Sequence, residues 1–364
     1  MFDNIYKGKR VLITGHTGFK GSWLCAWLLD LGATVAGYSV DVPTEPSHFE
    51  ALDLTDRIEH FQGDVQNKSS LQEAMNQFRP EIVFHLAAQS LVRKSYENPV
   101  LTFKTNSIGT LNLLDCLRDH PSVIATILIT SDKCYENVEW LWGYRENDRL
   151  GGKDPYSASK ACAEIISKVY METFFKEKGP SIATTRAGNV IGGGDWALDR
   201  IVPDCVRAWS KSEKVEIRNP NATRPWQHVL EPLSGYLVLG QKLLQGNPEM
   251  NNQSFNFGPS AKINQSVGEL ITDMAQYWPG AKWEFEQELV LGKPESTLLK
   301  LNCDKALQML NWNSVLDFQE TIRMTGTWYQ DYYGQSPSTV SETTSRQIEE
   351  YIEIATQADL AWTQ

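Results

Sequence analysis

Disulfide-forming and metal-binding patterns are missing from this chain of 364 residues. Its six cysteines are widely spaced and include no C-x-x-C pair. This usage predicts reduced thiols in a cytoplasmic protein rather than a disulfide framework. The six histidines show no metal-ligand spacing either, so the sequence predicts no zinc site.

Long apolar runs and an excess of positive charge are also missing. No segment reaches the roughly 18 apolar residues that span a bilayer, and the N-terminal segment lacks the apolar core of a signal peptide. The net charge of −11 argues against binding to nucleic acid or to an anionic membrane. A phosphate-bearing ligand must therefore be held by a few local cations and by backbone amides.

A strand-forming run, a glycine turn and a helix pattern follow one another over residues 10–32. Apolar residues precede Gly15, Gly18 and Gly21, and later apolar positions recur at helical spacing. Glycines let the backbone approach a pyrophosphate, and a helix N-terminus offers free N–H groups. The G-x-x-G-x-x-G spacing in this context predicts dinucleotide binding. A tight turn without a ligand is the alternative interpretation.

The choice between NAD and NADP depends on Asp41, which follows a second predicted strand at 34–40. It lies about 20 residues beyond the glycines, where a carboxylate accepts hydrogen bonds from the adenosine ribose. No lysine or arginine lies between Lys20 and Arg57 to pair with a 2′-phosphate. The sequence therefore predicts NAD.

Strand and helix patterns alternate through the first half of the chain. Further strands are predicted at 58–62, 82–86, 123–130 and 182–186, and the helices between them at 68–78, 99–117 and 155–178. This alternation predicts an α/β fold with a Rossmann-type, doubly wound parallel sheet, whose ligands lie at the carboxyl ends of the strands.

The chain is long enough for one large domain or two modest ones. We expect a Rossmann domain over residues 1–189, joined by strands from the C-terminal half. A smaller mixed α/β substrate-binding domain is expected over 190–334, and a C-terminal tail with one helix near 348–356 over 335–364. A glycine- and charge-rich insert at 136–153 is either a lid over the substrate or a loop held to the surface by its aromatic residues.

Tyr156 and Lys160 lie four residues apart at the start of a predicted helix, so they project from one face. A tyrosine is a poor base because its usual pKa is about 10, and a neighbouring ammonium lowers that value. The polar run Ser131-Asp132-Lys133 follows a predicted strand directly. Behind a glycine fingerprint, this combination predicts acid–base catalysis.

Four segments together resemble the extended short-chain dehydrogenase/reductase family, over about residues 9–333. They are Thr14 to Gly21, Asp64-Val65, His85 to Ala88 and Tyr156 to Lys160. The resemblance implies a set of NAD contacts, namely Gly15, His16, Thr17, Gly18, Phe19, Lys20, Gly21, Asp41, Asp64, Val65, Leu86, Ala87, Ala88, Tyr156 and Lys160.

Within that family, residues 130–135 are similar to the catalytic segment of nucleotide-sugar 4,6-dehydratases. Most of these enzymes carry Asp-Glu where this chain has Asp132-Lys133. Those that act on CDP-glucose carry Asp-Lys, so the resemblance implies CDP-glucose as the substrate. A 4,6-dehydratase of another nucleotide sugar, a nucleotide-sugar 4-epimerase and an NAD-sensing regulator are the alternatives.

The resemblance also implies a role for each catalytic residue. Tyr156, helped by Lys160, removes the proton of the sugar C4 hydroxyl, and Ser131 hydrogen-bonds the same oxygen. Asp132 protonates the departing C6 hydroxyl. Lys133 is either the base at C5 or a charge that stabilises the enolate. A salt bridge to an acid of the insert is the third interpretation of Lys133.

Residues 224–229 are similar to the arginine segment that binds pyrophosphate in these dehydratases. The candidate substrate contacts, besides Ser131, are Asn189, Arg207, Arg218, Arg224 and Lys300. Related dehydratases often have a second arginine where this chain has Gly292-Lys293-Pro294-Glu295. The resemblance further implies a homodimer, or a dimer of dimers, joined through the helices at 99–117 and 155–178.

Overall fold

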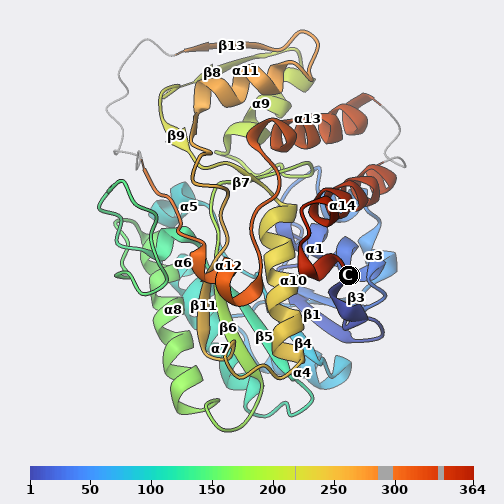
Figure 1. Cartoon of the computed structure of the whole chain (residues 1–364), viewed down its shortest axis with the longest axis vertical. Coiled ribbons are helices and arrows are strands. Elements are labelled where there is room, and N and C mark those ends of the chain that lie inside the picture. Colours follow the sequence, from blue (N-terminus) through green and yellow to red (C-terminus); the bar gives the residue numbers. More distant parts are fainter. Residues whose placement is uncertain (218, 286–297, 335–339) are drawn as a thin grey trace.

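The computed structural model describes residues 1–217, 219–285, 298–334 and 340–364. Seven parallel strands form its central sheet, in the order β11-β6-β5-β4-β1-β2-β3 (Figure 1). The strands are β1 (Arg10–Thr14), β2 (Thr34–Ser39), β3 (Glu59–Gln62), β4 (Ile82–His85), β5 (Ala125–Ile129), β6 (Ser181–Arg186) and β11 (Gln253–Asn256). The predicted strands differ from these bounds by a residue or two. This strand order confirms the Rossmann-type fold, with β11 supplied from the C-terminal half.

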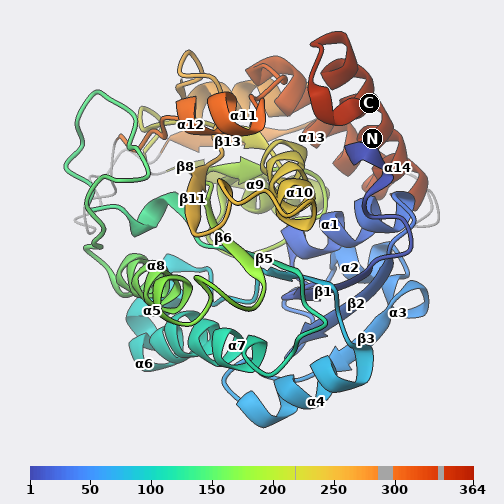
Figure 2. The ribbon, with the colours of Figure 1, turned by 60° about the horizontal axis from the view of Figure 1, so that its bottom comes forward.

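The sheet is buried on both faces, so its strands are apolar without alternation. Val11 and Ile13 of β1 face one core, and Leu12 between them faces the other. Helices α1 (Phe19–Asp30) and α10 (Leu230–Leu244) contribute to the first core. The second core is completed by α4 (Lys68–Phe78), α7 (Gly109–Leu117) and α8 (Pro155–Thr173), which Figure 2 shows on the opposite side of the sheet.

The helix predicted at 99–117 is interrupted by a wider turn. It consists of α6 (Pro99–Phe103), the π-helical turn η2 (Lys104–Ile108) and α7. The η2 turn faces α8, where Asn106 Nδ2 donates to Ser159 Oγ at 2.9 Å and Ser107 Oγ donates to the Ser159 carbonyl at 3.0 Å. Such π turns often occur beside functional sites, and Ser159 lies next to Lys160.

Shorter elements complete the first half of the chain. They are η1 (Phe2–Asn4), α2 (His48–Ala51), α3 (Leu54–Arg57), α5 (Val92–Glu97) and η3 (Asp132–Cys134).

Part of the second half, including α9 (Ile201–Ser210), α11 (Val267–Ala275) and α13 (Phe318–Gly334), lies above the sheet in Figure 1, whereas α12 (Asp304–Leu310) and α14 (Val340–Gln357) lie beside it. The short turn η5 (Ala361–Thr363) follows α14. The remaining strands pair two by two, as β7 (Val190–Ile191) with β10 (Gln227–His228), β9 (Thr223–Arg224) with β12 (Gln265–Ser266), and β8 (Lys214–Ile217) with β13 (Lys282–Phe285). None of the helices in the described ranges is long and apolar enough to cross a membrane.

The C-terminal helix α14 is longer and more buried than the helix predicted at 348–356. Its buried face includes Thr344 and Gln347, which are polar and therefore hide the helical pattern in the sequence. Thr344 Oγ1 accepts a hydrogen bond of 3.0 Å from Trp328 Nε1, and Gln347 Nε2 donates to the Met324 carbonyl at 2.7 Å. Both bonds fasten α14 to α13.

Candidate active site

The glycine turn after β1 packs against the end of β4. Gly15 has a positive φ of 76°, and a Cβ there would lie 2.7 Å from the Ala87 amide nitrogen. A Cβ on Gly21 would lie 2.3 Å from the Gly15 carbonyl oxygen. Only glycine therefore fits at these two positions, and the turn keeps α1 close to the end of the sheet.

The first turn of α1 is suited to a phosphate. Gly18 is the N-cap residue, and no side chain caps the helix. The first intrahelical bond is from the Ser22 amide to the Gly18 carbonyl at 2.9 Å, so the amides of Phe19, Lys20 and Gly21 are left for a ligand. This uncapped N-terminus fits the pyrophosphate of a dinucleotide.

The predicted adenosine contacts follow β2 and β3. Asp41 is exposed, and its carbonyl accepts a hydrogen bond of 2.7 Å from Thr17 Oγ1. The Asp64 carboxylate accepts from the Gln66 amide at 2.9 Å, and its carbonyl accepts from Tyr38 at 3.1 Å. Val65 is buried beside them. This arrangement leaves the Asp41 carboxylate available to a ribose.

Among the predicted cofactor residues, His16 has other partners in the structure. The fully buried His16 imidazole lies 2.7 Å from His60 Nδ1 and 3.0 Å from Ser39 Oγ. Burial lowers its pKa to about 3, so the ring is neutral and faces the protein interior. Leu86 and Ala88, which flank Ala87 after β4, are half-buried.

The predicted catalytic run lies at the carboxyl end of β5, in η3. Ser131 caps this turn by accepting a bond of 3.2 Å from the Lys133 amide, and it donates to Asp132 Oδ1 at 2.9 Å. Asp132 is buried against Gly188, where a Cβ would lie 2.0 Å from Asp132 Oδ2. The Asp132 carboxylate therefore has a fixed orientation.

Helix α8 brings Tyr156 and Lys160 to the same place. Asp154 caps the helix by accepting from the Ser157 amide at 2.9 Å. Lys160 Nζ donates to the Ile129 carbonyl at 3.2 Å, and burial lowers its pKa to about 8. Burial raises the pKa of Tyr156 to about 12, with the Ser131 hydrogen bond acting in the opposite direction.

The pKa of Tyr156 is raised above its usual value rather than lowered, in contrast to the expectation from its neighbour Lys160. Burial outweighs the hydrogen bond from Ser131, and the Lys160 ammonium is bonded to a backbone carbonyl. Tyr156 is therefore a neutral phenol at pH 7.

Lys133 is half-buried beside Asp132. Two acids of the insert pair elsewhere, Glu136 with Arg149 at 2.9 Å and Asp148 with Arg145 at 3.3 Å. In the part of the chain that the structure describes, the Lys133 ammonium has no ion-pair partner. The salt-bridge interpretation of Lys133 thus gains no support.

Lys20 and Arg200 add positive charge next to these residues. Burial lowers the pKa of Lys20 to about 8, helped by the charges of Arg200 and Lys160 and opposed by that of Asp132. Sequence reasoning missed Arg200, which pairs with Asp195 at 2.7 Å and donates to Ser90 Oγ at 3.2 Å. Arg200 is the N-cap residue of α9 and belongs to none of the segments that carry the family resemblance.

The predicted substrate contacts fall into two groups. Asn189 and Arg224 are both half-buried near β10, whose Gln227 amide donates to the Asn189 carbonyl at 3.1 Å. Arg224 Nη1 donates to the Thr223 carbonyl at 2.9 Å. Arg207 instead bonds the Trp196 carbonyl at 2.6 Å and pairs with Asp204 on its own helix.

The remaining predicted contacts are Lys300, Arg218 and the 292–295 segment. The Lys300 carbonyl accepts a bond of 2.8 Å from the Tyr144 amide, which joins its segment to the insert. Arg218 and the 292–295 segment lie outside the described residues. The second group, Arg207 and Lys300, thus has local contacts that explain its position without a ligand.

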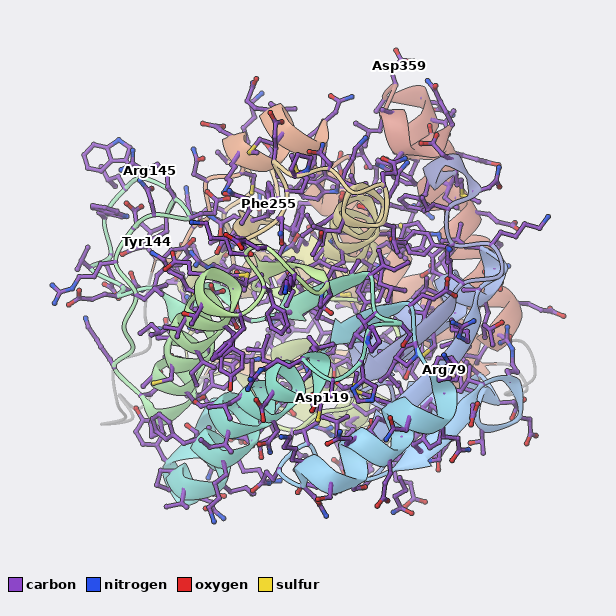
Figure 3. All side chains as sticks on the ribbon, turned by 90° about the horizontal axis from the view of Figure 1, so that it is seen from below. Arg79, Asp119, Tyr144, Arg145, Phe255 and Asp359 are labelled. Carbon is purple, nitrogen blue, oxygen red and sulfur yellow. The ribbon has the colours of Figure 1, made fainter. Side chains whose placement is uncertain are left out.

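The insert at 136–153 is held by Tyr144 and by its neighbour Glu146. The buried Tyr144 ring stacks on Tyr135 with centroids 5.1 Å apart, and Glu146 Oε1 accepts from the Asn256 amide at 2.8 Å. Trp142 is 72% exposed, and the insert with Tyr144 and Arg145 projects from one side of the molecule (Figure 3). These contacts match the interpretation as a loop held by an aromatic residue.

Comparisons with known proteins agree with this geometry. The chain is 44% identical over 360 residues to CDP-glucose 4,6-dehydratase of Salmonella typhimurium strain LT2, covering 97% of this chain and 99% of that protein. A solved UDP-glucose 4-epimerase of Thermus thermophilus in complex with NAD has a TM-score of 0.74 and 25% identity, over 88% of this chain and 99% of that one.

The chain also shares the fold of a solved dTDP-glucose 4,6-dehydratase of Bacillus anthracis in complex with NAD. The TM-score is 0.73 and the identity 19%, over 89% of this chain and 97% of that one. A family model described as GDP-mannose 4,6 dehydratase matches residues 12–325. Because this match spans most of the chain and includes the glycine turn, η3 and α8, the chain belongs to the GDP-mannose 4,6 dehydratase family.

Proposed function

We propose that the protein is an NAD-dependent 4,6-dehydratase that converts CDP-glucose to CDP-4-keto-6-deoxyglucose. The observation that carries the proposal is the placement of Asp132 and Lys133 in η3, next to Tyr156 and Lys160. A 4-epimerase needs Ser131, Tyr156 and Lys160 but no acid for a departing C6 hydroxyl. The identity of 44% to the Salmonella enzyme supports CDP-glucose, and so does the Asp132-Lys133 pair, which the family resemblance associates with that substrate.

The residues at the carboxyl edge of the sheet suit NAD. The open N-terminus of α1 would hold the pyrophosphate, and Asp41 would hold the adenosine ribose. NAD, when bound, supplies the hydride acceptor for sugar C4 and the hydride donor for C6. The positive charge of its nicotinamide would join Lys160 and Lys20 in stabilising a Tyr156 phenolate.

Tyr156 and Ser131 would act on the C4 oxygen. Tyr156 takes the hydroxyl proton and Ser131 donates a hydrogen bond to the oxygen as it becomes a carbonyl. Lys160 stabilises the phenolate through its charge. The resulting 4-keto group makes the C5 hydrogen acidic, which prepares the loss of water across C5 and C6.

Asp132 and Lys133 would carry out the elimination. Asp132 gives a proton to the departing C6 hydroxyl, and its tight packing on Gly188 fixes where that proton is delivered. Lys133 either takes the C5 proton itself or stabilises the enolate by its charge, in which case another base takes the C5 proton. Its lack of an ion-pair partner within the described ranges is compatible with both roles.

Asn189 and Arg224 would bind the sugar nucleotide. The guanidinium of an arginine forms bidentate contacts with a pyrophosphate. The adjacent amides of Trp226 and Gln227 donate to the carbonyls of Arg224 and Asn189. Arg207, Arg218 and Lys300 are the weaker candidates. We place the enzyme in the cytoplasm, because all six cysteines are free thiols.

The protein would assemble as a homodimer, or a dimer of dimers, through η2, α6 and α8. This face exposes four large apolar side chains, Val100, Ile108, Ile165 and Val169. Apolar residues gathered on packed helices are typical of a subunit interface. Sedimentation of the wild type and of Val169→Asp tests this, since loss of the dimer is expected in the variant alone.

The function is tested by incubating the protein and NAD with CDP-glucose, dTDP-glucose, UDP-glucose and GDP-mannose. The expected result is a 4-keto-6-deoxy product formed fastest from CDP-glucose. Preference for another nucleotide would overturn the choice of substrate. A sugar inverted at C4 would identify an epimerase, and no turnover of any substrate would favour a regulator.

A further inference from the structure

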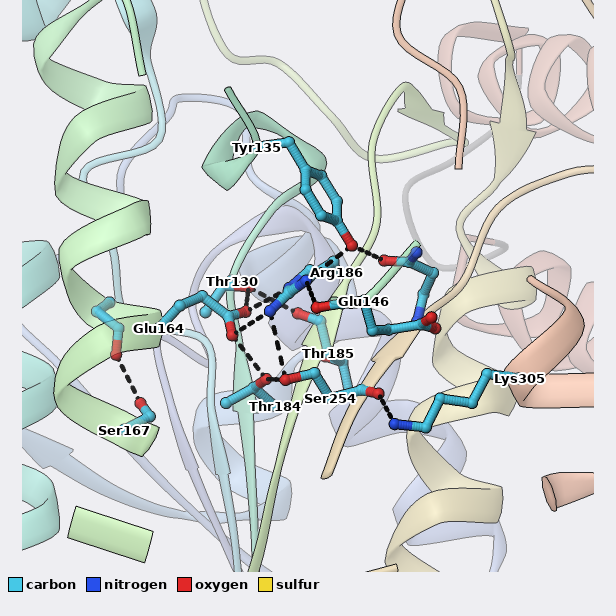
Figure 4. A network of polar contacts seen from close by, with 12 residues as sticks. Thr130, Tyr135, Glu146, Glu164, Ser167, Thr184, Thr185, Arg186, Ser254 and Lys305 are labelled. Carbon is cyan, nitrogen blue, oxygen red and sulfur yellow. Dashed lines mark hydrogen bonds and ion pairs between the residues drawn. The ribbon is translucent and has the colours of Figure 1, made fainter. Parts of the chain in front are cut away.

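A buried ion pair lies beneath the catalytic segment. Glu164 of α8 and Arg186 at the end of β6 are both 3% exposed. The guanidinium meets the carboxylate through two bonds, from Nε to Oε1 at 2.9 Å and from Nη2 to Oε2 at 2.8 Å (Figure 4). Such fork-to-fork pairs hold a fixed relative geometry.

All five N–H donors of Arg186 have partners. Besides the two bonds to Glu164, Nη2 donates to Ser254 Oγ at 3.3 Å. Nη1 donates to Tyr135 Oη at 2.7 Å and to the Glu146 carbonyl at 3.0 Å. The guanidinium therefore cannot turn without breaking several bonds in a buried environment.

The pair holds the catalytic segment from both ends. Thr130, directly before Ser131, contacts Glu164 Oε1 through its hydroxyl. Tyr135, directly after Cys134, bonds Arg186 and places its ring 4.8 Å from the guanidinium carbon. Ser131, Asp132 and Lys133 thus lie on a short arch whose two ends rest on one ion pair.

The same pair joins this arch to the other half of the site. Tyr156, Lys160 and Glu164 follow one another at intervals of four residues on α8, so they share one face of the helix. Glu164 also opposes the lowering of the Lys160 pKa through its charge. The ion pair is therefore bonded to the arch and is part of the helix that carries the tyrosine.

We propose that Glu164 and Arg186 are positioning residues for the dehydration, and that they fix Asp132 and Lys133 relative to Tyr156 and Lys160 through Thr130 and Tyr135. The proposal rests on the proposed function. Stability alone does not explain the pair, because apolar residues of similar volume often replace a buried ion pair without loss. Fixed geometry explains why one pair contacts both ends of the arch.

Four deletions of a single hydroxyl test the proposal, and two of them are matched controls. Thr130→Val and Tyr135→Phe remove the hydrogen bonds of the arch with Glu164 and with Arg186, together with the bonds of the same hydroxyls to the Thr185 carbonyl and to Asn256 Oδ1. Thr184→Val and Ser254→Ala are the two controls. Thr184 Oγ1 donates to Glu164 Oε2 at 2.9 Å, and Ser254 Oγ accepts from Arg186 Nη2. Each control therefore removes a hydroxyl that contacts the ion pair but does not touch the arch. All four variants keep the ion pair itself.

The expected result is a kcat lower by about 10- to 100-fold in Thr130→Val and Tyr135→Phe, the cost of a small misplacement of catalytic groups. KM is expected to stay within about twofold. Thr184→Val and Ser254→Ala are expected to keep the wild-type kcat although their melting temperatures fall similarly. Equal losses of kcat in all four variants, or no loss in the first two, would overturn the proposal.

Amide hydrogen exchange of the peptide over 130–135 gives a second readout that needs no substrate. Faster exchange is expected in Thr130→Val and Tyr135→Phe and not in the two controls. If the wild type converts no nucleotide sugar, the proposed function fails. Hydrogen exchange then still tests whether the ion pair holds the segment over 130–135 in place. Unchanged exchange in all variants would then overturn the positioning role.

Discussion

Tyr351 of α14 donates a hydrogen bond of 2.8 Å to Glu231 Oε2 of α10. The other oxygen of that carboxylate accepts from the backbone amides of Val315 and Leu316 at 2.8 and 2.7 Å. Glu231 is 1% exposed, and burial raises its pKa from 4.5 to about 7. One buried carboxyl group thus joins the sheet-covering helix to the C-terminal helix and to the segment before α13.

This raised pKa predicts a dependence of stability on pH. Between about pH 4.5 and 7 the folded protein keeps a proton on Glu231 that the unfolded chain releases, so the free energy of unfolding falls as the pH rises through this window. The loss is on the order of 3 kcal/mol, at about 1.4 kcal/mol for each unit of pKa.

Glu231→Gln mimics the protonated carboxyl and keeps an oxygen for the amides of Val315 and Leu316. We expect chemical denaturation at several pH values to give a flatter profile for this variant than for the wild type. Glu213→Gln, which makes the same change of charge at an exposed position, is the control and should keep the wild-type slope. Equal slopes in all three proteins would contradict the assignment.

Gly188→Ala is expected to impair catalysis while leaving the fold intact. The new methyl group would lie 2.0 Å from Asp132 Oδ2, so the carboxylate must move. We expect kcat to fall by at least about 10-fold, because small displacements of a catalytic group are costly. Gly268→Ala, whose methyl group would lie 3.4 Å from its nearest neighbour, is the matched control for steady-state kinetics. A wild-type kcat in Gly188→Ala would show that Asp132 tolerates displacement.

The sequence predicted the central sheet because its strands are buried on both faces and therefore form apolar runs such as 82–86. It also predicted the candidate catalytic residues that are close neighbours in the chain, Ser131 to Lys133 and Tyr156 with Lys160. Their shared location follows from the topology, since the carboxyl ends of parallel strands lie at one edge of a sheet.

The features that the sequence did not predict depend on contacts between distant segments. In the sequence, nothing distinguishes Glu164 and Arg186 from other charged residues. Their ion pair forms because β6 lies beside β5 and close to α8. The length of helix α14 was underestimated because its buried face includes the polar residues Thr344 and Gln347, whose hydrogen-bond partners lie on distant segments of the chain. The raised Tyr156 pKa likewise depends on burial that the spacing of Tyr156 and Lys160 does not encode.

The role of Arg224 can be separated from that of Arg207 by replacing each with lysine. Lysine keeps the charge but loses the bidentate fork, so Arg224→Lys should weaken substrate binding by about 1–3 kcal/mol, the range for hydrogen bonds to charged groups. Arg207→Lys should leave KM unchanged, because its guanidinium is engaged by Trp196 and Asp204. The measurement is KM for CDP-glucose alongside the Kd for NAD, which neither change should affect. An unchanged KM in Arg224→Lys would remove that residue from the substrate site.

Asp132→Asn separates a dehydratase from an epimerase. The substitution keeps the oxygen that accepts the Ser131 hydrogen bond at 2.9 Å and keeps the shape that packs on Gly188. It removes only the transferable proton, so elimination should slow by roughly 10²–10⁴-fold, the usual contribution of general acid catalysis. Oxidation at C4 depends on Ser131, Tyr156 and Lys160 and should continue.

Single-turnover absorbance of the reduced cofactor should therefore rise in Asp132→Asn and persist, whereas the wild type shows only a transient rise. Tyr156→Phe should give the opposite pattern, with no rise, because it blocks the first proton transfer. Turnover of Asp132→Asn at the wild-type rate would show that another group protonates the C6 hydroxyl. Absence of the rise in Asp132→Asn would place Asp132 before elimination, so that its carboxylate would have to act together with Ser131 on the C4 oxygen.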